Sequence, residues 1–518
     1  MAKPPPPTGG DQVADRRAKL ERMRSEFGIE PYGRRADGLI DLASARGLFD
    51  EVKQGDDRPT AAVAGRVVLH RDIGSLVFMT LRDASGDLQI ALSKKAIESS
   101  IFKLAKLTDR GDIVVVRGRV GTTKTGEITL WAEPLPPSLP ETGGLAAYEV
   151  ASKALVPPPE KWKGLRDPEL RYRQRYVDMF ADPQVVQTFR LRSQIVSEIR
   201  RFMDQRQFLE VETPMLQPAA GGAAARPFVT HHNALDIDLF LRIAPELYLK
   251  RLLVGGLSRV YEINRNYRNE GVDRQHNPEF TLMEAYEAFG DYQSMLDLTE
   301  SLIRHLAKTV EPTGVLTCHE HTIDYNQPFR RVRYAELFES ACGFAMTETD
   351  RVRAKARESG LKEAGVDDWL VVNALFEAVA ESGLVQPTFV TDYPAAISPL
   401  TRPRRDDPDL CERWDLFIGA MECGTAYSEL NDPDVQEQKF RQQLAGADEQ
   451  EQTYRSFDED FLNALRVGMP PAGGLGLGID RIVMLLTGRH SIRDVILFPL
   501  LKPPGDRGHQ EENARKDK

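Results

Sequence analysis

Cysteine is scarce in this sequence. The 518 residues include only four, and no two of them form a Cys-x-x-Cys pair: Cys318, Cys342, Cys411 and Cys423. Neither a disulfide framework nor a thiolate zinc site is therefore indicated. His319 and His321 lie beside Cys318, but a structural zinc site needs a second pair of ligands, which is missing nearby. We expect four reduced, mostly buried thiols and an ordinary loop at these histidines.

Long hydrophobic runs are also missing. No apolar stretch approaches the ~18 residues that a membrane span needs, and the first ten residues, MAKPPPPTGG, contain no hydrophobic signal segment. We therefore expect a soluble, cytoplasmic protein with no membrane partner. Its length suggests about two to four domains with large buried cores.

The chain has no excess of positive charge. It has 68 Lys and Arg residues against 78 Asp and Glu residues, which gives a net charge of −10. This balance argues against indiscriminate binding of nucleic acid, so a nucleic-acid partner would need local basic patches.

One basic patch lies near the N-terminus. Residues Asp15–Glu26, DRRAKLERMRSE, are rich in helix formers and follow a proline-rich lead that we expect to be disordered. The predicted helix has two possible roles, which stay open. It could contact phosphates through its cations, Arg16, Arg17, Lys19, Arg22 and Arg24. It could instead pack on a domain through Leu20, Met23 and Phe27.

Between Thr60 and Trp131 the pattern changes to short strands separated by turn signals. We predict five strands: Ala62–Leu69, Leu76–Arg82, Leu88–Leu92, Ile113–Val120 and Glu127–Trp131. A tight hairpin at Asp83–Asp87 joins the second to the third, and a helix at Ala96–Lys106 precedes the fourth. Five strands with a helix in this place indicate an OB-fold barrel.

Barrels of this kind bind single-stranded nucleic acid by stacking bases on aromatic rings and by bonding to base edges. Phe78 and Gln89 fall on adjacent predicted strands, where they are placed to do both. The alternative is that Phe78 is an ordinary core residue, which is the commoner role for one phenylalanine on a strand.

Residues 134–164 are rich in proline, with PLPPSLPETGG followed by VPPPEKWKG. Proline favours extended conformers, so we predict a linker here rather than a third packed domain. The linker is long enough either to change how the flanking domains hold a partner or simply to bulge into solvent.

A further domain is predicted to open near Leu170. A helix with one apolar face follows, and its face is formed by Leu191, Ile195, Ile199 and Phe202. Next comes the strand Glu210–Pro214. Because Pro214 cannot donate a ladder hydrogen bond, this strand should lie at a sheet edge or an interface.

Small residues and one carboxylate come next in the chain. Gly221–Arg226 is rich in small residues, which allow close approach to the backbone. Glu246 follows the segment Arg242-Ile-Ala-Pro245. It is either a site residue or a carboxylate that stabilises the start of a helix through the helix dipole.

The segment Arg259–Asp291 concentrates charged side chains in a predicted antiparallel hairpin. Its strands are Val260–Asn264 and Phe280–Phe289, joined through a turn at Glu270-Gly271. Side chains two apart share a strand face. This pairing applies to Arg268 with Glu270 and to Glu284 with Tyr286. A guanidinium binds a phosphate or carboxylate by two parallel hydrogen bonds, and Phe280 offers a surface for a purine. The alternative is a solvated, charged hairpin without function.

The same segment resembles a known family. The runs YRNEG, HNPEFT and MEAYEAFGDY are similar to the second signature motif of class II aminoacyl-tRNA synthetases, in the form of the subclass IIb lysine enzymes. Phe208–Leu216 resembles the first motif and Gly474–Arg481 the third, in the family's order. The resemblance extends from about Arg16 to about Lys502, and it implies an α+β fold in which an OB-fold β-barrel is joined to an antiparallel sheet flanked by helices.

The resemblance also implies a division of the chain. Residues 1–59 would hold the N-terminal lead and basic helix, 60–133 the anticodon-binding OB-fold and 134–164 the linker. The class II catalytic domain would occupy 165–502, and 503–518 would form a disordered charged tail. In the family the first motif forms a homodimer contact, which suits one self-pairing segment on a twofold axis.

The implied activity is the joining of L-lysine to tRNA(Lys) with ATP and Mg²⁺. Arg268 would bridge the lysine carboxylate and the α-phosphate, and Phe280 and Arg481 would enclose adenine. The other expected ATP contacts are Glu270, His276, Asn277 and Glu422, with Arg268, Glu270 and Arg481 as catalytic residues. The expected lysine contacts are Gly222, Glu246, Glu284, Tyr286, Thr425, Tyr427 and Glu429. The expected magnesium ligands are Asp415 and Glu422, and the expected anticodon contacts are Phe78, Gln89 and Glu127.

Two residues depart from the family's pattern. Asp415 stands where the family usually has glutamate, and Thr425 where it usually has asparagine. We expect a bridging water or a shifted ion at Asp415, and at Thr425 either a tolerated change or a reshaped pocket. Alternatives to the lysine enzyme are a ligase that lysylates a protein, a non-catalytic tRNA-binding paralogue, and an aspartate or asparagine enzyme. The last would need a cationic pocket where this chain has Glu429.

Overall fold

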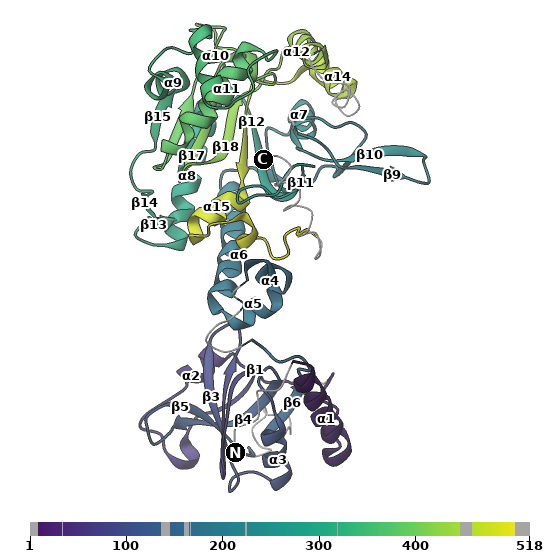
Figure 1. Cartoon of the computed structure of the whole chain (residues 1–518), viewed down its shortest axis with the longest axis vertical. Helices are drawn as coiled ribbons and strands as arrows, with labels where there is room; N and C mark the ends of the chain where they lie inside the picture. The colour runs from purple at the N-terminus through teal and green to yellow at the C-terminus, as the bar shows by residue number, and fades with distance from the viewer. Residues whose placement is uncertain are drawn as a thin grey trace. The chain divides into compact units, whose positions relative to one another are not determined.

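The computed structural model describes residues 9–33, 35–135, 146–159, 165, 167–222, 225–318, 320–445 and 458–502. His319, residues 136–145 and 160–164 of the predicted linker, and the predicted charged tail lie outside these ranges. The chain divides into two compact units, 1–187 and 188–518, and each is described by itself (Figure 1). In the part that the structure describes, no helix has the length and apolar character needed to cross a membrane.

The N-terminal unit contains the predicted barrel. Its strands are β1 (Thr60–Ile73), β2 (Leu76–Arg82), β3 (Asp87–Ser93), β4 (Ile113–Thr122), β5 (Ile128–Ala132) and β6 (Tyr148–Ser152). The sheet order is β1-β2-β3-β5-β4-β6, and an additional pairing of β1 with β4 closes it. α3 (Ser99–Leu107) lies between β3 and β4 in the chain, as predicted. The alternating apolar residues of these strands, such as Val77, Met79 and Leu81, fill the interior.

The linker prediction is wrong at β6. Tyr148–Ser152 forms a strand that pairs antiparallel with β4. Tyr148 and Val150 are buried, and the Tyr148 hydroxyl lies 2.6 Å from the Thr108 hydroxyl. The prolines on either side hid a short alternating strand whose apolar side chains complete the barrel core.

The N-terminal helix α1 (Gly9–Phe27) packs on the barrel within this unit. Leu20 and Met23 are buried, and Met23 belongs to the barrel core. Arg16 is buried too and donates to two backbone carbonyls, those of Arg110 and Ala154. The packing role is therefore present, and the phosphate-binding role stays a prediction. The remaining helices of the unit are α2 (Leu42–Gly47), η1 (Gly55–Asp57), α4 (Pro168–Arg173) and α5 (Arg175–Ala181).

The second unit is built on an eight-stranded sheet. Its order is β15-β16-β17-β18-β19-β12-β11-β7, and its strands are β7 (Leu209–Glu210), β11 (Arg259–Tyr267), β12 (Glu279–Ala288), β15 (Arg330–Arg333), β16 (Thr388–Thr391), β17 (Arg413–Ile418), β18 (Met421–Ser428) and β19 (Ala472–Gly478). The pairs β15–β16 and β11–β7 are parallel, and the other pairs are antiparallel. The predicted antiparallel sheet is confirmed, with a parallel pair at each edge.

The first-motif strand is shorter than predicted. β7 covers Leu209–Glu210 rather than Glu210–Pro214, and it lies at the sheet edge as the proline indicated. Two small sheets lie beside the large one: β8 (Leu216–Gln217) with β10 (Ile237–Leu241) and β9 (Val229–His232), and β13 (Val315–Cys318) with β14 (His321–Asp324). Figure 1 shows β9 and β10 as a hairpin that extends away from the large sheet.

Helices pack on the large sheet and leave part of it open for a site. α8 (Tyr292–Val310) begins with a capping box between Asp291 and Ser294, and it packs with α15 (Ile479–Thr487) against the apolar side chains of β12, β18 and β19. α6 (Pro183–Asp204) leads into this unit. The other described helices of the unit are α7 (Glu246–Val254), α9 (Tyr334–Cys342), α10 (Thr349–Glu358), α11 (Asp368–Val379), η2 (Glu381–Gly383), η3 (Ala395–Ile397), α12 (Pro433–Ala445), α14 (Glu459–Gly468) and α16 (Ile492–Val495).

Candidate active site

A pocket lies on the three central strands of the large sheet, β12, β19 and β18. Along β12, Met283 and Ala285 enter the core, whereas Glu284 and Tyr286 line the pocket. This alternation is the one expected of a strand with one face on the core. The lining also includes Gly222, Glu246, Arg268, Glu270, His276, Asn277, Phe280, Glu422, Thr425, Tyr427 and Arg481. The structure therefore brings together nearly all of the predicted ligand-binding residues of this unit.

Two glycines of β19 form the floor between two walls of larger side chains. Gly476 is in register with Glu284 on β12 and Thr425 on β18, and Gly474 is in register with Tyr286 and Tyr427. A side chain on β19 would fill the space between the walls. A Cβ atom at Gly474 would stand 1.8 Å from Oε1 of Glu429 and 2.6 Å from a ring carbon of Tyr286. Glycine is required at Gly474 because of this close approach.

One end of the pocket is acidic. The Tyr286 hydroxyl donates to Glu284 at 3.0 Å, and the Tyr427 hydroxyl donates to Oε2 of Glu246 at 2.9 Å. Burial raises the pKa of the Glu284 carboxyl well above its usual range, and the nearby Glu246 carboxylate adds to the rise. Cationic groups of a ligand would relieve this accumulation of negative charge.

Glu246 has both roles that its position suggested. It is the first residue of α7, and it also lines the pocket. Gly222 lies opposite with a φ of +87°, and a Cβ there would come within 3.3 Å of Glu246 Cβ. The glycine therefore keeps its backbone close to the Glu246 side chain.

Glu429 lies behind the floor rather than in the described lining. It is fully buried, and its Oε2 forms an ion pair with Lys250, which is fully buried as well. Its Oε1 has no hydrogen-bond partner among the described residues. Because Oε1 lies just under the missing Cβ of Gly474, it can accept a hydrogen bond from a ligand in the pocket. Lys250 was missed by the sequence reasoning.

Arg268 is near the middle of the pocket. It follows the last residue of β11, so Arg268 and Glu270 lie in the loop and not on the predicted strand face. Its guanidinium carbon lies 5.1 Å from the centre of the Phe280 ring, and its buried Nε has no hydrogen-bond partner in the described structure. Burial lowers the pKa of Arg268, although Glu270 and Glu422 oppose this. An anion is the natural partner for such a group.

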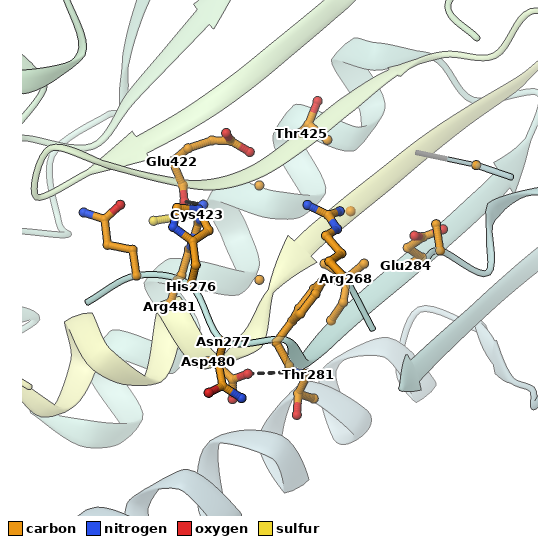
Figure 2. A pocket seen from close by; sticks show the side chains of 18 of the residues that line it. Arg268, His276, Asn277, Thr281, Glu284, Glu422, Cys423, Thr425, Asp480 and Arg481 are labelled. Atoms are coloured by element: carbon orange, nitrogen blue, oxygen red, sulfur yellow. Dashed lines mark hydrogen bonds between the residues drawn. The ribbon is translucent and has the colours of Figure 1, made fainter. Parts of the chain in front are cut away.

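Arg481 and His276 meet at the other end of the pocket. Arg481, in the first turn of α15, donates at 2.6 Å to the backbone oxygen of Glu422 and lies 3.1 Å from His276 Nε2. The carboxylate of Asp273 contacts His276 Nδ1 at 2.8 Å and shapes the loop. Figure 2 shows Arg268 between this group and Glu284, so the pocket has a cationic region with an acidic end beyond it.

Asp480 is a supporting residue that the sequence reasoning missed. Its carboxylate accepts from the backbone N–H of Thr281 at 2.7 Å, the dashed bond in Figure 2, and forms an ion pair with Arg192 at 2.5 Å. It therefore ties the start of α15, and Arg481 with it, to β12. The only advance signal was its place beside Arg481 in the third motif.

Asp415 and Glu422 lie near each other, but Asp415 already has a partner. Arg413 donates to both oxygens of Asp415, at 3.1 and 2.8 Å. Enclosure by the protein raises the pKa of the Glu422 carboxyl, and Asp415 adds to the rise. Burial, assisted by the surrounding carboxylates, raises the pKa of neighbouring Glu381 to about 7. Glu422 lines the pocket, and part of its surface stays exposed to solvent.

The corner around Glu422 holds oxygen donors of the kind that magnesium prefers. The described residues contain no group of three or more Asp, Glu, His or Cys side chains that could hold a metal by themselves. Magnesium commonly binds through one or two carboxylates, water and substrate phosphates. The carboxylates of Asp415 and Glu422 repel each other and lie beside the cationic region of the pocket, which fits that pattern. Glu422 is the accessible carboxylate of the two.

Thr425 lies on the pocket wall with its hydroxyl turned toward the sheet. Its Oγ1 lies 3.4 Å from the backbone oxygen of Trp414, to which it can donate a long hydrogen bond. The hydroxyl therefore has a partner within the protein. The carboxamide of an asparagine at this position would be longer and could reach a ligand.

The predicted nucleic-acid surface of the barrel has more partners than expected. Phe78 is half-buried and lies edge to face with Trp131, with ring centres 6.3 Å apart. Gln89 accepts from Arg71 at 2.9 Å and donates to Thr129 at 2.8 Å. Phe78 is thus neither a fully buried core residue nor an isolated ring. Trp131 and Arg71 were missed because strand register, not sequence spacing, brings them beside Phe78.

Glu127 is placed differently from the prediction. It precedes β5 instead of lying on it, is exposed, and lies 3.6 Å from Arg46 in an ion pair. The free cysteines agree with expectation: Cys318, Cys411 and Cys423 are buried, and Cys342 is partly buried.

Comparison with known proteins gives sequence matches over nearly the whole chain. Residues 167–502 match the family described as class II tRNA synthetases (D, K and N), and residues 61–135 match the OB-fold nucleic acid binding domain. A lysine–tRNA ligase of Carboxydothermus hydrogenoformans is 48% identical over 95% of this chain and 98% of its own length. A lysine–tRNA ligase of Pelotomaculum thermopropionicum is 47% identical over 94% of each chain, and one of Magnetococcus marinus is 45% identical over 95% of this chain and 97% of its own.

Proposed function

The chain belongs to the class II tRNA synthetases of the D, K and N group, and we propose that it activates L-lysine with ATP and transfers it to tRNA(Lys). The observation that carries the choice of lysine is the acidic end of the pocket. Glu246 and Glu284 line it, and the carboxylate of a third residue, Glu429, lies just behind its floor at Gly474. A substrate with two ammonium groups complements them, whereas an acidic side chain would be repelled.

The lysine substrate is bound with its ends apart. Its α-ammonium group lies near Glu246 and Glu284, beside the backbone of Gly222. Its ε-ammonium group extends over Gly474 toward the free Oε1 of Glu429. This arrangement is supported by the missing partner of that oxygen and by the Cβ-free floor above it. Tyr286 and Tyr427 position the surrounding carboxylates through their hydroxyls.

ATP occupies the cationic region. Adenine lies between Phe280 and Arg481, and Arg268 bridges the lysine carboxylate and the α-phosphate, which gives its unpaired Nε an acceptor. Glu270, His276 and Asn277 order the loop around the nucleotide.

The reaction has two steps and requires no side-chain nucleophile. An oxygen of the lysine carboxylate bonds to the α-phosphorus as the bond to pyrophosphate breaks. A terminal ribose hydroxyl of the tRNA then bonds to the lysyl carbonyl carbon as AMP leaves. Positioning of this kind supplies up to roughly 7–11 kcal/mol of the barrier, and Arg268 stabilises charge at the reacting phosphate.

Mg²⁺ would be held by Glu422, with Asp415 in a secondary place. When bound, the ion neutralises phosphate oxygens of ATP. Asp415 already accepts twice from Arg413, so we assign it contact through a bridging water or with a shifted ion.

The barrel binds the anticodon of tRNA(Lys). Phe78 stacks one base, and Trp131 extends the aromatic surface beside it. Gln89 is held by Arg71 and Thr129 in an orientation suited to reading a base edge. Glu127 would join them after leaving its exposed pair with Arg46.

A homodimer is the proposed assembly. Apolar side chains are exposed around the first motif and on the β9–β10 hairpin, with exposed fractions of 51% for Leu209, 48% for Leu216, 60% for Val229 and 65% for Leu235. Such a concentration of exposed apolar residues marks an interface, and a twofold axis would bury it against its own copy.

The experiment that tests this function is a charging assay with labelled lysine. We expect label on the 3′ end of tRNA(Lys), with loss of charging in Arg268→Ala. Label on a protein acceptor but not on tRNA would favour the protein-modifying alternative, and no label on either would favour the non-catalytic paralogue. Charging with aspartate or asparagine would overturn the substrate assignment.

A further inference from the structure

Lys250 forms a buried bridge between two carboxylates of the lysine pocket. Its Nζ donates to Oε1 of Glu246 at 2.6 Å and forms an ion pair with Oε2 of Glu429. All three side chains are buried, with exposed fractions of 0% for Lys250, 4% for Glu246 and 0% for Glu429. The aromatic rings of Tyr427 and Phe461 lie 5.7 and 5.9 Å from the ammonium group.

The bridge leaves each carboxylate one oxygen toward the ligand side. On Glu246, Oε1 is taken by Lys250 and Oε2 accepts from Tyr427, which lines the pocket. On Glu429, Oε2 is taken by Lys250 and Oε1 is the unpaired atom under Gly474. Lys250 itself is not among the described residues that line the pocket, so it acts on a ligand only through these two partners.

The charges of the loaded site balance only when Lys250 is counted. Glu246, Glu284 and Glu429 would contribute three negative charges when ionised. The two ammonium groups of a lysine substrate supply two positive charges, and the substrate carboxylate is matched by Arg268. Lys250 supplies the third positive charge, and a site this buried tolerates little uncompensated charge.

We propose that Lys250 is a positioning residue for lysine recognition: its fixed ammonium group keeps Glu246 and Glu429 ionised and aimed at the two ammonium groups of the substrate. This inference rests on the proposed function, because it assumes lysine in the pocket. It predicts that Lys250 governs the affinity for lysine and not the affinity for ATP.

The electrostatics of the bridge agree with this role. Burial alone would lower the pKa of Lys250, but Glu246 and Glu429 outweigh it and the pKa is raised. Burial raises the pKa of the Glu429 carboxyl, and Lys250 opposes that rise. The other charged or titratable groups that face the bridge are Glu284, Tyr286, Tyr427 and Arg402. Without Lys250, one of its two carboxylates would bind a proton and lose its charge.

The test is Lys250→Met, assayed by ATP–pyrophosphate exchange in the full-length protein. We expect the KM for lysine to rise by about tenfold or more, with the KM for ATP changed by less than about twofold. We also expect the KM for lysine to fall more steeply in the variant than in the unaltered protein as the pH rises from ~6 to ~8.5, because deprotonation of a second carboxyl adds to the dependence that Glu284 gives to both proteins. A loss of packing alone would not produce this dependence.

The matched control is Lys153→Met. Lys153 is also fully buried between two carboxylates, at 2.5 Å from Asp109 and 2.9 Å from Asp112, but it belongs to the N-terminal unit. The Lys153→Met substitution should leave the KM for lysine and the KM for ATP unchanged in the exchange assay. If Lys250→Met does not fold, Lys250→Gln keeps donors to both carboxylates without the charge and carries the same comparison.

The outcomes separate the two proposals. Failure of the unaltered protein to activate lysine overturns the proposed function. Activation by the unaltered protein, together with a lysine KM in the folded Lys250 variant that is unchanged or no more dependent on pH than in the unaltered protein, overturns the role of Lys250 alone.

Discussion

Replacement of Gly474 by alanine is the sharpest structural perturbation of the lysine site. The backbone φ of Gly474 is not positive, so alanine adopts the conformation without strain, and the cost comes from contact alone. The new Cβ would stand 1.8 Å from Oε1 of Glu429 and 2.6 Å from Tyr286. The Glu429 oxygen would have to retreat by about 1.6 Å to reach ordinary van der Waals distance.

That retreat removes the hydrogen bond proposed for the ε-ammonium group of lysine. A bond to a charged group contributes ~1.5–3 kcal/mol, which corresponds to a rise of roughly 10- to 150-fold in the KM for lysine. The KM for ATP should change little, because Arg268, Phe280 and Arg481 are not displaced. The assay is ATP–pyrophosphate exchange at varied lysine and at varied ATP.

Gly476→Ala provides the matched control on the same strand. A Cβ there would meet no protein residue except Thr425, at 3.8 and 4.0 Å, so Glu429 and Tyr286 stay in place and the rise in the lysine KM should be well below that of Gly474→Ala. Equal effects of the two substitutions, or a Gly474→Ala variant that loses ATP and lysine affinity together, would refute the placement of the ε-ammonium group beside Glu429.

Three other variants test separate parts of the account. Phe78→Ala should spare pyrophosphate exchange but lower aminoacylation through the loss of one base stack, ~1–3 kcal/mol; unchanged charging would make Phe78 a packing residue. Thr425→Asn should lower the KM for lysine by up to tenfold, or ~1.4 kcal/mol, without changing the preferred amino acid, and a preference for ornithine, arginine or β-lysine in the natural enzyme would contradict this. The ionised form of Glu284 binds ammonium and exists only above its raised pKa, so the KM for lysine should rise as the pH falls through that pKa. Glu284→Gln should flatten this dependence, and an equally steep profile in that variant would exclude Glu284 as its source.

The fold could be predicted from local sequence pattern where apolar and polar side chains alternate strictly. The β11–β12 hairpin and the barrel strands were placed within a few residues, because burial follows the period of two that the sequence displays. β6 escaped prediction because it is only five residues long and lies in a segment whose many prolines indicated a linker. Its partner, β4, lies more than thirty residues earlier in the chain.

The site residues were predicted through motifs, but the residues that hold them in place were not. Lys250 drew no prediction, since lysine is rarely buried without partners. Its burial depends on Glu429, which is far away in the sequence and reaches it only after β18 forms. Arg413 lies two residues before Asp415 on β17, so the two share a strand face; Asp415 was predicted as a metal ligand without this neighbour.

ATP–pyrophosphate exchange across the amino acids, with and without tRNA(Lys), tests the central claim most directly. We expect exchange that depends on lysine, requires Arg268 and proceeds without tRNA, since the adenylate forms before the tRNA reacts. Exchange driven best by another amino acid, or no exchange with lysine in the folded protein, would contradict it.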